Sequence, residues 1–291
     1  MLQFAKDIYN YIRNAIPYSM PKEKAHKYIY KKRHKKEADF VNPKTYDEII
    51  HYHMIYTYDD NYAKYADKIL VRDYVKECGF EDILVPIVGG PYNNANEINF
   101  DELPDSFVMK TNHASGSNHY QIVKDKSKLT DDDKKKMVKK FNKALKENFA
   151  MKLCQYHYRT IEPKIYCEKL LASDNDYITD YKVVCSYGDP KAILVCSDRY
   201  GGRDYFNCDW EYLEYTKKER RYNGEIKRPE HLERMVEAAK ALSKLFPVAR
   251  IDFYESEGKL YFSEITLTPS AGNHASLTEY AQKELGRKIG I

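Results

Sequence analysis

The chain has 291 residues, enough for one large domain or for two or three small ones. Its 48 basic and 44 acidic residues leave a formal net charge of only +4, which is too small to indicate a nucleic-acid-binding protein. The six cysteines show neither a C-x-x-C pair nor the spacing of zinc ligands, so reduced, buried thiols of a cytoplasmic protein are the simplest interpretation. No stretch reaches the ~18 apolar residues that a membrane-spanning helix requires.

The N-terminal segment 1–16 predicts an amphipathic helix. Its apolar residues would share one face: Leu2, Ile8, Tyr9, Ile12 and Ile16. Charged residues interrupt the segment, so it does not resemble a signal peptide, and a basic run over 22–36 follows it. Two interpretations are open. The helix packs onto the body of the protein, or it contacts the anionic inner face of a membrane together with the basic run.

The next segments predict helices and one buried strand. Thr45 and Glu48 stand three residues apart in the pattern of a capping box, so a helix is expected to begin there. A second helix is expected over 68–78, because Gly79 would end it. The apolar run 83–88 (ILVPIV) predicts a buried strand after that helix.

The middle of the chain predicts two strands, over 106–110 and 120–124, joined by a loop of small residues. The backbone N–H groups of such a loop can close on phosphate oxygens, and Lys110 would bring a mobile positive charge beside them. The loop candidates for phosphate contact are Ser115, Gly116 and Ser117, and His113 is a candidate for phosphate or substrate contact. An ordinary hairpin loop is the alternative interpretation.

Five further elements are expected before the C-terminal part. Thr130 precedes three aspartates and is expected to cap a helix with a solvated, lysine-rich face. Three strands are expected next: one over 164–171, one that begins at Asp180, and one over 191–199 after a Gly-Asp-Pro turn. A helix is expected over 232–246.

The stretch 248–274 predicts a β-hairpin with polar groups on one face. Arg250 and Asp252 are two residues apart, as are Glu264 and Thr266, so each pair points to one side of its strand. Pairing of the strands would bring two carboxylates together in otherwise apolar surroundings, which is costly unless a cation lies between them. Hard oxygen ligands suit Mg²⁺ bridging phosphates. An exposed hairpin with solvated acids is the alternative.

These residues resemble a known family. The pattern R-x-D, a turn, then Y-x-x-E-x-T-x-x-P-S resembles the metal-binding end of ATP-grasp ligases such as the D-alanine–D-alanine ligases. The stretches NPKTYDE, LPDSFVMKTNHASGS and SDR resemble the TupA-like branch, which is associated with teichuronopeptide and capsular polysaccharide loci. The motifs run in family order from Lys68 to His274. Two departures are Thr266, where the family usually has asparagine, and a phosphate loop with a single glycine.

The resemblance implies an α+β chain with the ATP-grasp fold, in which a nucleotide lies between two α+β subdomains with antiparallel sheets. The expected divisions are an N-terminal subdomain over 1–100, a lid over 101–166 and a C-terminal subdomain with the metal site over 167–291.

The resemblance also implies roles for individual residues. ATP is the implied nucleotide and Mg²⁺ the implied metal, with Asp252, Glu264 and Thr266 as its ligands. The implied phosphate contacts are Lys68, Lys110, the loop and Arg199, with Arg203 nearby. The implied adenine and ribose contacts are Glu168, Lys169, Leu171 and Asp180. Arg250 would stabilise an acyl-phosphate, and the amine-bearing substrate would contact Ser270, Asn273 and His274, aided by exposed N–H groups near a helix start at Ser276.

The implied function is an ADP-forming carboxylate–amine ligase that joins an amino acid or amine to a uronic acid or peptide of a cell-surface polysaccharide. A glycosyltransferase using a nucleotide-sugar is the alternative. It would more often show a D-x-D pair, and the two pairs present, Asp131-x-Asp133 and Asp174-x-Asp176, open a lysine-rich helix and lie in a polar loop. A non-catalytic scaffold would be expected to lose Arg250 or the acids, which are intact.

Overall fold

The structure is a computed structural model that describes residue 9 and residues 12–172, 178–197 and 202–291. Its helices are α2 (Lys22–His34), α3 (Tyr46–Tyr56), α4 (Ala63–Ala66), α5 (Val71–Glu77), α6 (Asp131–Ala144), α7 (Leu232–Leu242) and α8 (Glu279–Ile289). Its strands are β1 (Ile87–Tyr92), β2 (Phe107–Thr111), β3 (Tyr120–Val123), β4 (Ile165–Lys169), β5 (Asp180–Ser186), β6 (Asp189–Cys196), β7 (Arg203–Phe206), β8 (Tyr212–Leu213), β9 (Ala249–Ser256) and β10 (Lys259–Thr266). Three short 3₁₀ segments also matter below: η6 (Phe149–Cys154), η7 (Tyr156–Tyr158) and η9 (Pro269–Ala271).

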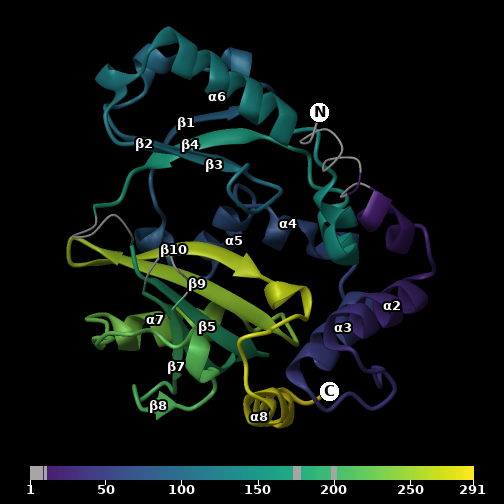
Figure 1. The fold of residues 1–291 in the computed structure, drawn as a ribbon. Coiled ribbons are helices and arrows are strands. Elements are labelled where there is room, and N and C mark those ends of the chain that lie inside the picture. The colour runs from purple at the N-terminus through teal and green to yellow at the C-terminus, as the bar shows by residue number, and fades with distance from the viewer. Residues whose placement is uncertain (1–8, 10–11, 173–177, 198–201) are drawn as a thin grey trace.

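The strands form two antiparallel sheets. A four-stranded sheet has the order β1-β4-β2-β3, and a six-stranded sheet has the order β10-β9-β5-β6-β7-β8. Figure 1 shows the small sheet above the large one, with α4 and α5 at the level between them. This arrangement confirms the expected α+β class with antiparallel sheets.

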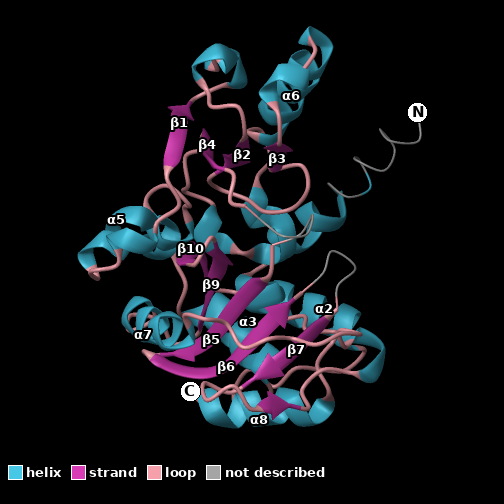
Figure 2. Ribbon diagram, turned by 90° about the vertical axis from the view of Figure 1, so that its left-hand side faces the viewer, coloured by secondary structure: helices cyan, strands magenta, loops and turns pink. Residues whose placement is uncertain are grey.

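Helices cover both faces of the large sheet. Residues of α7 pack with Val183, Ile251 and Phe253 on one face, because odd-numbered positions of β5 and β9 point to that side. On the other face, α3 and α8 pack against Val184 and Leu194. Figure 2, turned by 90°, shows the helices on the two sides of this sheet. Further along the second face the strands carry polar residues, and the candidate site lies there.

The small sheet is covered by α6 on one side only. Phe107, Met109 and Cys167 pack there against Met137 and Phe141 of α6. Alternation along the strands therefore turns the intervening residues Val108, Lys110, Tyr166 and Glu168 to the opposite side, which carries the charged groups described below.

The first helices pack beside the segment that follows α6. Ala25 and Ile29 of α2 contact Cys154 and Tyr156, so α2 lies against η6. Residues 12–18 are helical, but Ile12 and Ile16 are each 50% exposed and Tyr9 is 63% exposed. These three residues of the predicted apolar face are therefore not packed onto the described body of the protein, and the other two, Leu2 and Ile8, lie outside the described residues. Among the described residues, no helix is long and apolar enough to cross a membrane.

Three expected elements differ in the structure. The helix expected over 68–78 is α5 and begins at Val71, because the carboxylate of buried Asp67 accepts the N–H groups of residues 69 and 70 and holds a turn there. The strand expected over 83–88 begins only at Ile87, since Pro86 has no N–H for a ladder. The helix expected near Ser276 begins at Glu279, after Thr278 accepts the N–H of Ala281.

The other expected elements are present. The capping box of Thr45 and Glu48 begins α3, and Thr130 caps α6 in the same way. All six cysteines are free thiols. The subdomain boundaries after residues 100 and 166 stay a prediction.

Candidate active site

The hairpin of β9 and β10 gathers the polar residues of the site. Its turn places Glu257 and Gly258 at φ values of 51° and 66°, the left-handed pair typical of a two-residue hairpin loop. Glu264 lies directly opposite Asp252, and Thr266 opposite Arg250. A bulge between Phe262 and Glu264 lets the apolar side chains stay in the core while these four face the same side. The expectation that the two carboxylates face each other is confirmed.

Asp252 is the most deeply buried acid of the hairpin. Its carboxylate is 1% exposed and accepts two hydrogen bonds from Arg250, from Nε and Nη2, each 2.7 Å long. Lys182 of β5 donates a third at 2.8 Å and also lies 3.0 Å from Asp180. The two neighbouring acids raise the pKa of Lys182 against the effect of burial, so this lysine stays charged.

Glu264 is bound by a cation from another part of the chain. Lys68 Nζ lies 3.0 Å from its carboxylate and also donates to the carbonyl oxygen of Ala114, at 3.1 Å. Burial raises the pKa of Glu264, but Lys68 and then Arg250 and Lys182 outweigh it and lower the pKa to about 2. Glu264 is therefore a charged carboxylate at neutral pH. Lys68 links the hairpin to the phosphate loop.

The charges at this centre balance. The cations Lys68, Lys182 and Arg250 are matched by the carboxylates of Asp180, Asp252 and Glu264. The oxygen donors of Asp252, Glu264 and Thr266 are of the kind that Mg²⁺ prefers, so the donor set fits the implied metal. A bare divalent cation would add charge to a centre that is already neutral. The site therefore suits Mg²⁺ that arrives with anionic phosphates rather than alone.

A second ion pair faces this centre from the small sheet. Lys110 donates to Glu168, and Arg72 of α5 lies 3.8 Å from the same carboxylate. Glu168 lies on β4, whose side chains at this level are nearly enclosed. Both residues were expected to contact the nucleotide, and the structure brings them together. Arg72 was not expected; its place in the first turns of a short helix gave no sequence signal.

The base of the phosphate loop is fixed by hydrogen bonds. Asn112 donates to Asp67 Oδ2 at 2.7 Å and accepts the N–H of Lys164 at 2.7 Å. Beyond the base, residues 115–118 are exposed, including the candidates Ser115, Gly116 and Ser117. His113 is 3% exposed, and neither ring nitrogen has a hydrogen-bond partner. Burial and the nearby His119 lower its pKa to about 4, so it is a neutral group beneath the loop.

The remaining nucleotide candidates lie at the ends of strands. Lys169 ends β4, its N–H donates to the carbonyl of Pro86 at 2.9 Å, and its side chain points to Glu257 in the hairpin turn. Leu171 follows it and is half-buried. Asp180 begins β5, where burial raises the pKa of its carboxyl despite the contact with Lys182. Arg199 lies outside the described residues, and Arg203 begins β7.

The post-hairpin loop, residues 268–274, is shaped by a buried acid of α3. Asp47 accepts hydrogen bonds from the ring and the backbone of His274, at 2.6 Å and 3.1 Å, and from Gln282 at 2.6 Å. Ser270 is exposed at a φ of 50°, and Asn273 is half-buried. His274 is therefore held by Asp47 as well as being a substrate candidate.

The loop does not offer the free N–H groups that we expected for a carboxylate. The N–H groups of Ala271, Gly272 and Asn273 donate to carbonyls of the same loop, and that of His274 donates to Asp47. Thr278 caps the following helix and accepts the N–H of Ala281 in the first turn of α8. Over residues 271–274 the N–H groups are therefore not exposed, because three consecutive left-handed residues close the loop on itself; the helix-start part of the expectation stays a prediction.

Besides Arg72, sequence reasoning missed two residues of the site. Lys182 could have been found, since it alternates with Asp180 along β5 and so points to the same face. Asp47 could not, because it stands in the first turn of α3, where an acid is expected for the helix dipole alone. Its contact with His274 joins positions 227 residues apart.

Comparison with solved structures finds ATP-grasp enzymes at low similarity. The D-alanine–D-alanine ligase of Helicobacter pylori is 16% identical with a TM-score of 0.40, over 77% of this chain and 60% of that one. The Bacillus anthracis enzyme complexed with ATP is 16% identical with a TM-score of 0.43, over 77% and 63%. The L-amino acid ligase of Bacillus licheniformis is 13% identical with a TM-score of 0.47, over 79% and 51%. The chain thus spans less than two thirds of the length of these enzymes.

No curated protein matches the chain. The family model described as TupA-like ATPgrasp does match, over residues 48–290. That range includes both sheets, the hairpin with its paired carboxylates and the post-hairpin loop. The chain belongs to the TupA-like ATP-grasp family.

Proposed function

We propose that the protein is an ATP-dependent carboxylate–amine ligase that releases ADP. The observation that carries this proposal is the hairpin face, where Arg250 and Asp252 lie opposite Glu264 and where Lys68 and Lys182 meet them. The family is one of ATP-grasp ligases, which are typically ADP-forming carboxylate–amine ligases.

We propose that the nucleotide lies between the two sheets. Lys68 and Lys110 would exchange their carboxylate partners for phosphate oxygens, with the exposed loop tip and Arg199 beside them. Asp252, Glu264 and Thr266 would hold Mg²⁺, which neutralises phosphate charge when bound. Glu168, Lys169 and Leu171 would meet the adenine, and Asp180 the ribose. The support is that Lys110 and Glu168 pair on the small sheet, while Lys68 joins Glu264 of the hairpin to the carbonyl oxygen of Ala114 in the loop.

In the proposed reaction a substrate carboxylate oxygen attacks the γ-phosphorus of ATP, and the bond to the β-phosphate oxygen breaks to release ADP. The amine of the second substrate then attacks the acyl carbon, forms an amide, releases phosphate and loses a proton. Arg250, whose planar guanidinium is already held by Asp252, would stabilise the acyl-phosphate. The rate would come mainly from positioning and charge stabilisation.

For the substrates we propose a uronic acid or peptide as the carboxylate and an amino acid or other small amine as the nucleophile, in the cytoplasm. The family resemblance to proteins of cell-surface polysaccharide loci supports this choice. Ser270, Asn273 and His274 would contact the amine-bearing substrate, and His113 is a candidate at the other side. Screening ADP release against pairs of uronic acids and amines would identify them.

A thermal-shift experiment tests the nucleotide assignment. ATP with Mg²⁺ should raise the melting temperature, whereas Mg²⁺ alone should not, because the centre is already neutral. Glu264→Gln keeps the shape of the ligand but removes its charge, so it should abolish the shift by ATP and leave the melting temperature of the free protein within a few degrees. Stabilisation by UDP-sugars and not by ATP would favour the glycosyltransferase instead.

The proposed role of Arg250 in the reaction is tested by measuring the turnover number of a variant. Arg250→Lys should keep the ATP-dependent shift and lower kcat, because an ammonium cannot form the two parallel bonds of the guanidinium. The exposed Arg234, substituted in the same way, is the matched control and should keep full turnover. Equal kcat in Arg250→Lys and the parent would remove Arg250 from the mechanism.

A further inference from the structure

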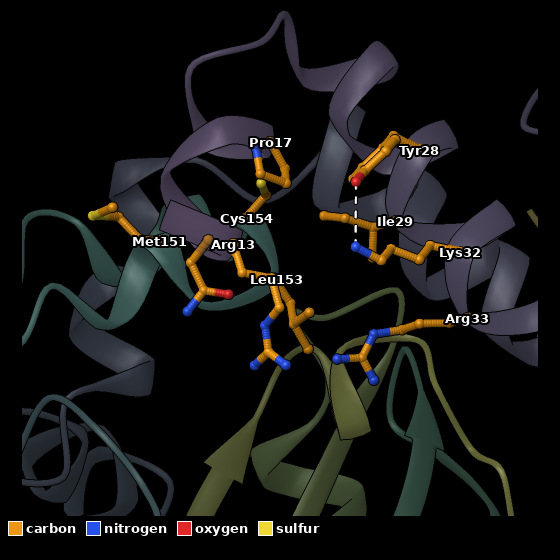
Figure 3. A pocket seen from close by; sticks show the side chains of 10 residues that line it. Arg13, Pro17, Tyr28, Ile29, Lys32, Arg33, Met151, Leu153 and Cys154 are labelled. Carbon is orange, nitrogen blue, oxygen red and sulfur yellow. Dashed lines mark hydrogen bonds between the residues drawn. The ribbon is translucent and has the colours of Figure 1, made fainter. Parts of the chain in front are cut away.

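A cavity of about 140 Å³ lies apart from the hairpin, between the helical segment 12–18, α2 and η6. Figure 3 shows its lining: the side chains of Arg13 and Arg33 converge from two helices, and Lys32 and Tyr28 lie above them. Ile29 and Leu153 give the cavity an apolar wall. None of these residues has a role in the proposed reaction.

The charges around this cavity are unbalanced. Its lining contains the cations Arg13, Lys32 and Arg33 and no carboxylate. Among the described residues none of the three forms an ion pair; Lys32 donates instead to the hydroxyl of Tyr28, at 3.3 Å. Burial and then the charge of Arg13 lower the pKa of Arg33, which shows that the two guanidiniums repel each other. An anion in the cavity would relieve this repulsion.

The hydrogen-bond donors that line the cavity indicate which kind of anion it would bind. Two guanidinium forks, an ammonium and a phenol hydroxyl can surround a tetrahedral oxyanion from several directions, and guanidinium matches phosphate with two parallel hydrogen bonds. The apolar wall would contact a carbon body attached to that phosphate. The cavity therefore suits a phosphate ester better than a free inorganic ion.

An exposed apolar stripe runs beside the cavity on the same helical segment. Ile12 and Ile16 are each 50% exposed, and their spacing of four residues puts them on one face; Tyr9 is 63% exposed. Arg13 and Pro17, which line the cavity, lie on the adjoining face. Exposed apolar residues next to unpaired cations are the pattern of a helix that lies at a membrane interface.

We propose that this cavity binds the phosphate group of an anionic membrane lipid, while Tyr9, Ile12 and Ile16 enter the boundary of the acyl chains. The observations that carry the proposal are the unpaired cations, the apolar wall and the stripe beside it. The proposal does not depend on the reaction, because none of its residues touches the hairpin centre.

Vesicle flotation of the full chain tests the membrane part. The parent should float with phosphatidylcholine vesicles that contain phosphatidylglycerol and not with phosphatidylcholine alone. Arg13→Gln/Arg33→Gln should abolish flotation. The matched control, Lys24→Gln/Lys36→Gln, removes the same charge from exposed positions in and just after α2, outside the cavity, and should weaken binding by at most about fivefold for each lysine. Equal weakening by both pairs would mean diffuse attraction and would overturn the proposal.

A soluble headgroup analogue tests the cavity itself. With a non-hydrolysable ATP analogue and Mg²⁺ present in excess, sn-glycerol 3-phosphate titrated into the parent should bind. Binding should fall more than tenfold in the arginine pair and remain in the lysine pair. Binding that is equal in all three proteins, or absent from the parent, would overturn the proposal. Glycerol phosphate binding without any flotation would assign the cavity to a soluble phosphate ester and would overturn the membrane assignment.

Discussion

Acid should unfold this protein well above the pH at which its carboxylates are protonated. Seven histidines are buried in the structure. Burial, the largest cause, lowers the pKa of four of them to a stated value, about 3 for His51 and His157 and about 4 for His53 and His113, and it also lowers that of His26. In the unfolded chain each titrates near 6.5. Between these values the unfolded state binds more protons than the folded state, so stability is lost as the pH falls below 6.5.

The loss of unfolding free energy follows from the number of protons that the histidines bind when the protein unfolds. At pH 5.5 each such histidine favours unfolding by about 1.4 kcal/mol, so the four together remove roughly 6 kcal/mol. A domain of ordinary stability has about 5–15 kcal/mol to lose. Glu264 affects stability only at lower pH. Because its pKa is lowered to about 2, the stabilisation that its ionised form contributes is lost only as the pH falls from 4.5 to 2.

Urea unfolding at pH 7.5, 6.5 and 5.5 measures this dependence, with the fluorescence of Trp210, which stacks on Phe206, as the signal. His157→Phe should reduce the stability lost between pH 6.5 and 5.5 by about 1 kcal/mol, since neither ring nitrogen of His157 has a partner to lose. Tyr156→Phe beside it is the control and should leave the slope unchanged. If the pH dependence of the free energy of unfolding between pH 6.5 and 5.5 corresponds to the uptake of less than one proton on unfolding, the reasoning is refuted.

Three further predictions concern the site and its supports. Lys182→Met should lower the free energy of unfolding by roughly 3–5 kcal/mol in urea, because it leaves buried Asp252 with one cation fewer; an unchanged value would contradict the pairing. Gly272→Ala should cost more than Gly258→Ala, by about 1–3 kcal/mol. Both glycines are left-handed, but only at Gly272 would a new Cβ lie 2.5 Å from a histidine ring, so equal losses would argue against this contact. Asp47→Asn should raise the KM for the amine substrate and leave that for ATP unchanged in initial-rate assays, because Asp47 holds the post-hairpin loop; a change in the KM for ATP alone would assign that loop to the nucleotide.

The hairpin could be predicted from the sequence because its signals are local. Two strands of alternating residues flank a Glu-Gly turn, and the spacing of Arg250, Asp252 and Glu264 fixes which side chains share a face. The capping boxes at Thr45 and Thr130 are local in the same sense. Patterns of this kind need no knowledge of the rest of the chain.

The partners of those residues could not be predicted, because they come from distant segments. Lys68 reaches Glu264 from the turn before α5, and His274 is taken by Asp47 across 227 positions. The boundary errors have local causes instead: Asp67 accepts the N–H groups of residues 69 and 70, Pro86 has no N–H for a ladder, and Thr278 caps α8. Only the hydrogen bond from Asn112 to the same Asp67 carboxylate is a contact that no local pattern reveals.

The division of the phosphate loop into a fixed base and an exposed tip has a consequence for engineering. Asp67 and Asn112 tie the base to the body of the protein, so substitutions there would disturb folding. The tip, 115–118, is exposed, and a side chain added at Gly116 would find no atom within 4 Å. The tip can therefore be randomised in a library with little loss of folded protein, and selection for activity from that library would test the proposed phosphate contacts.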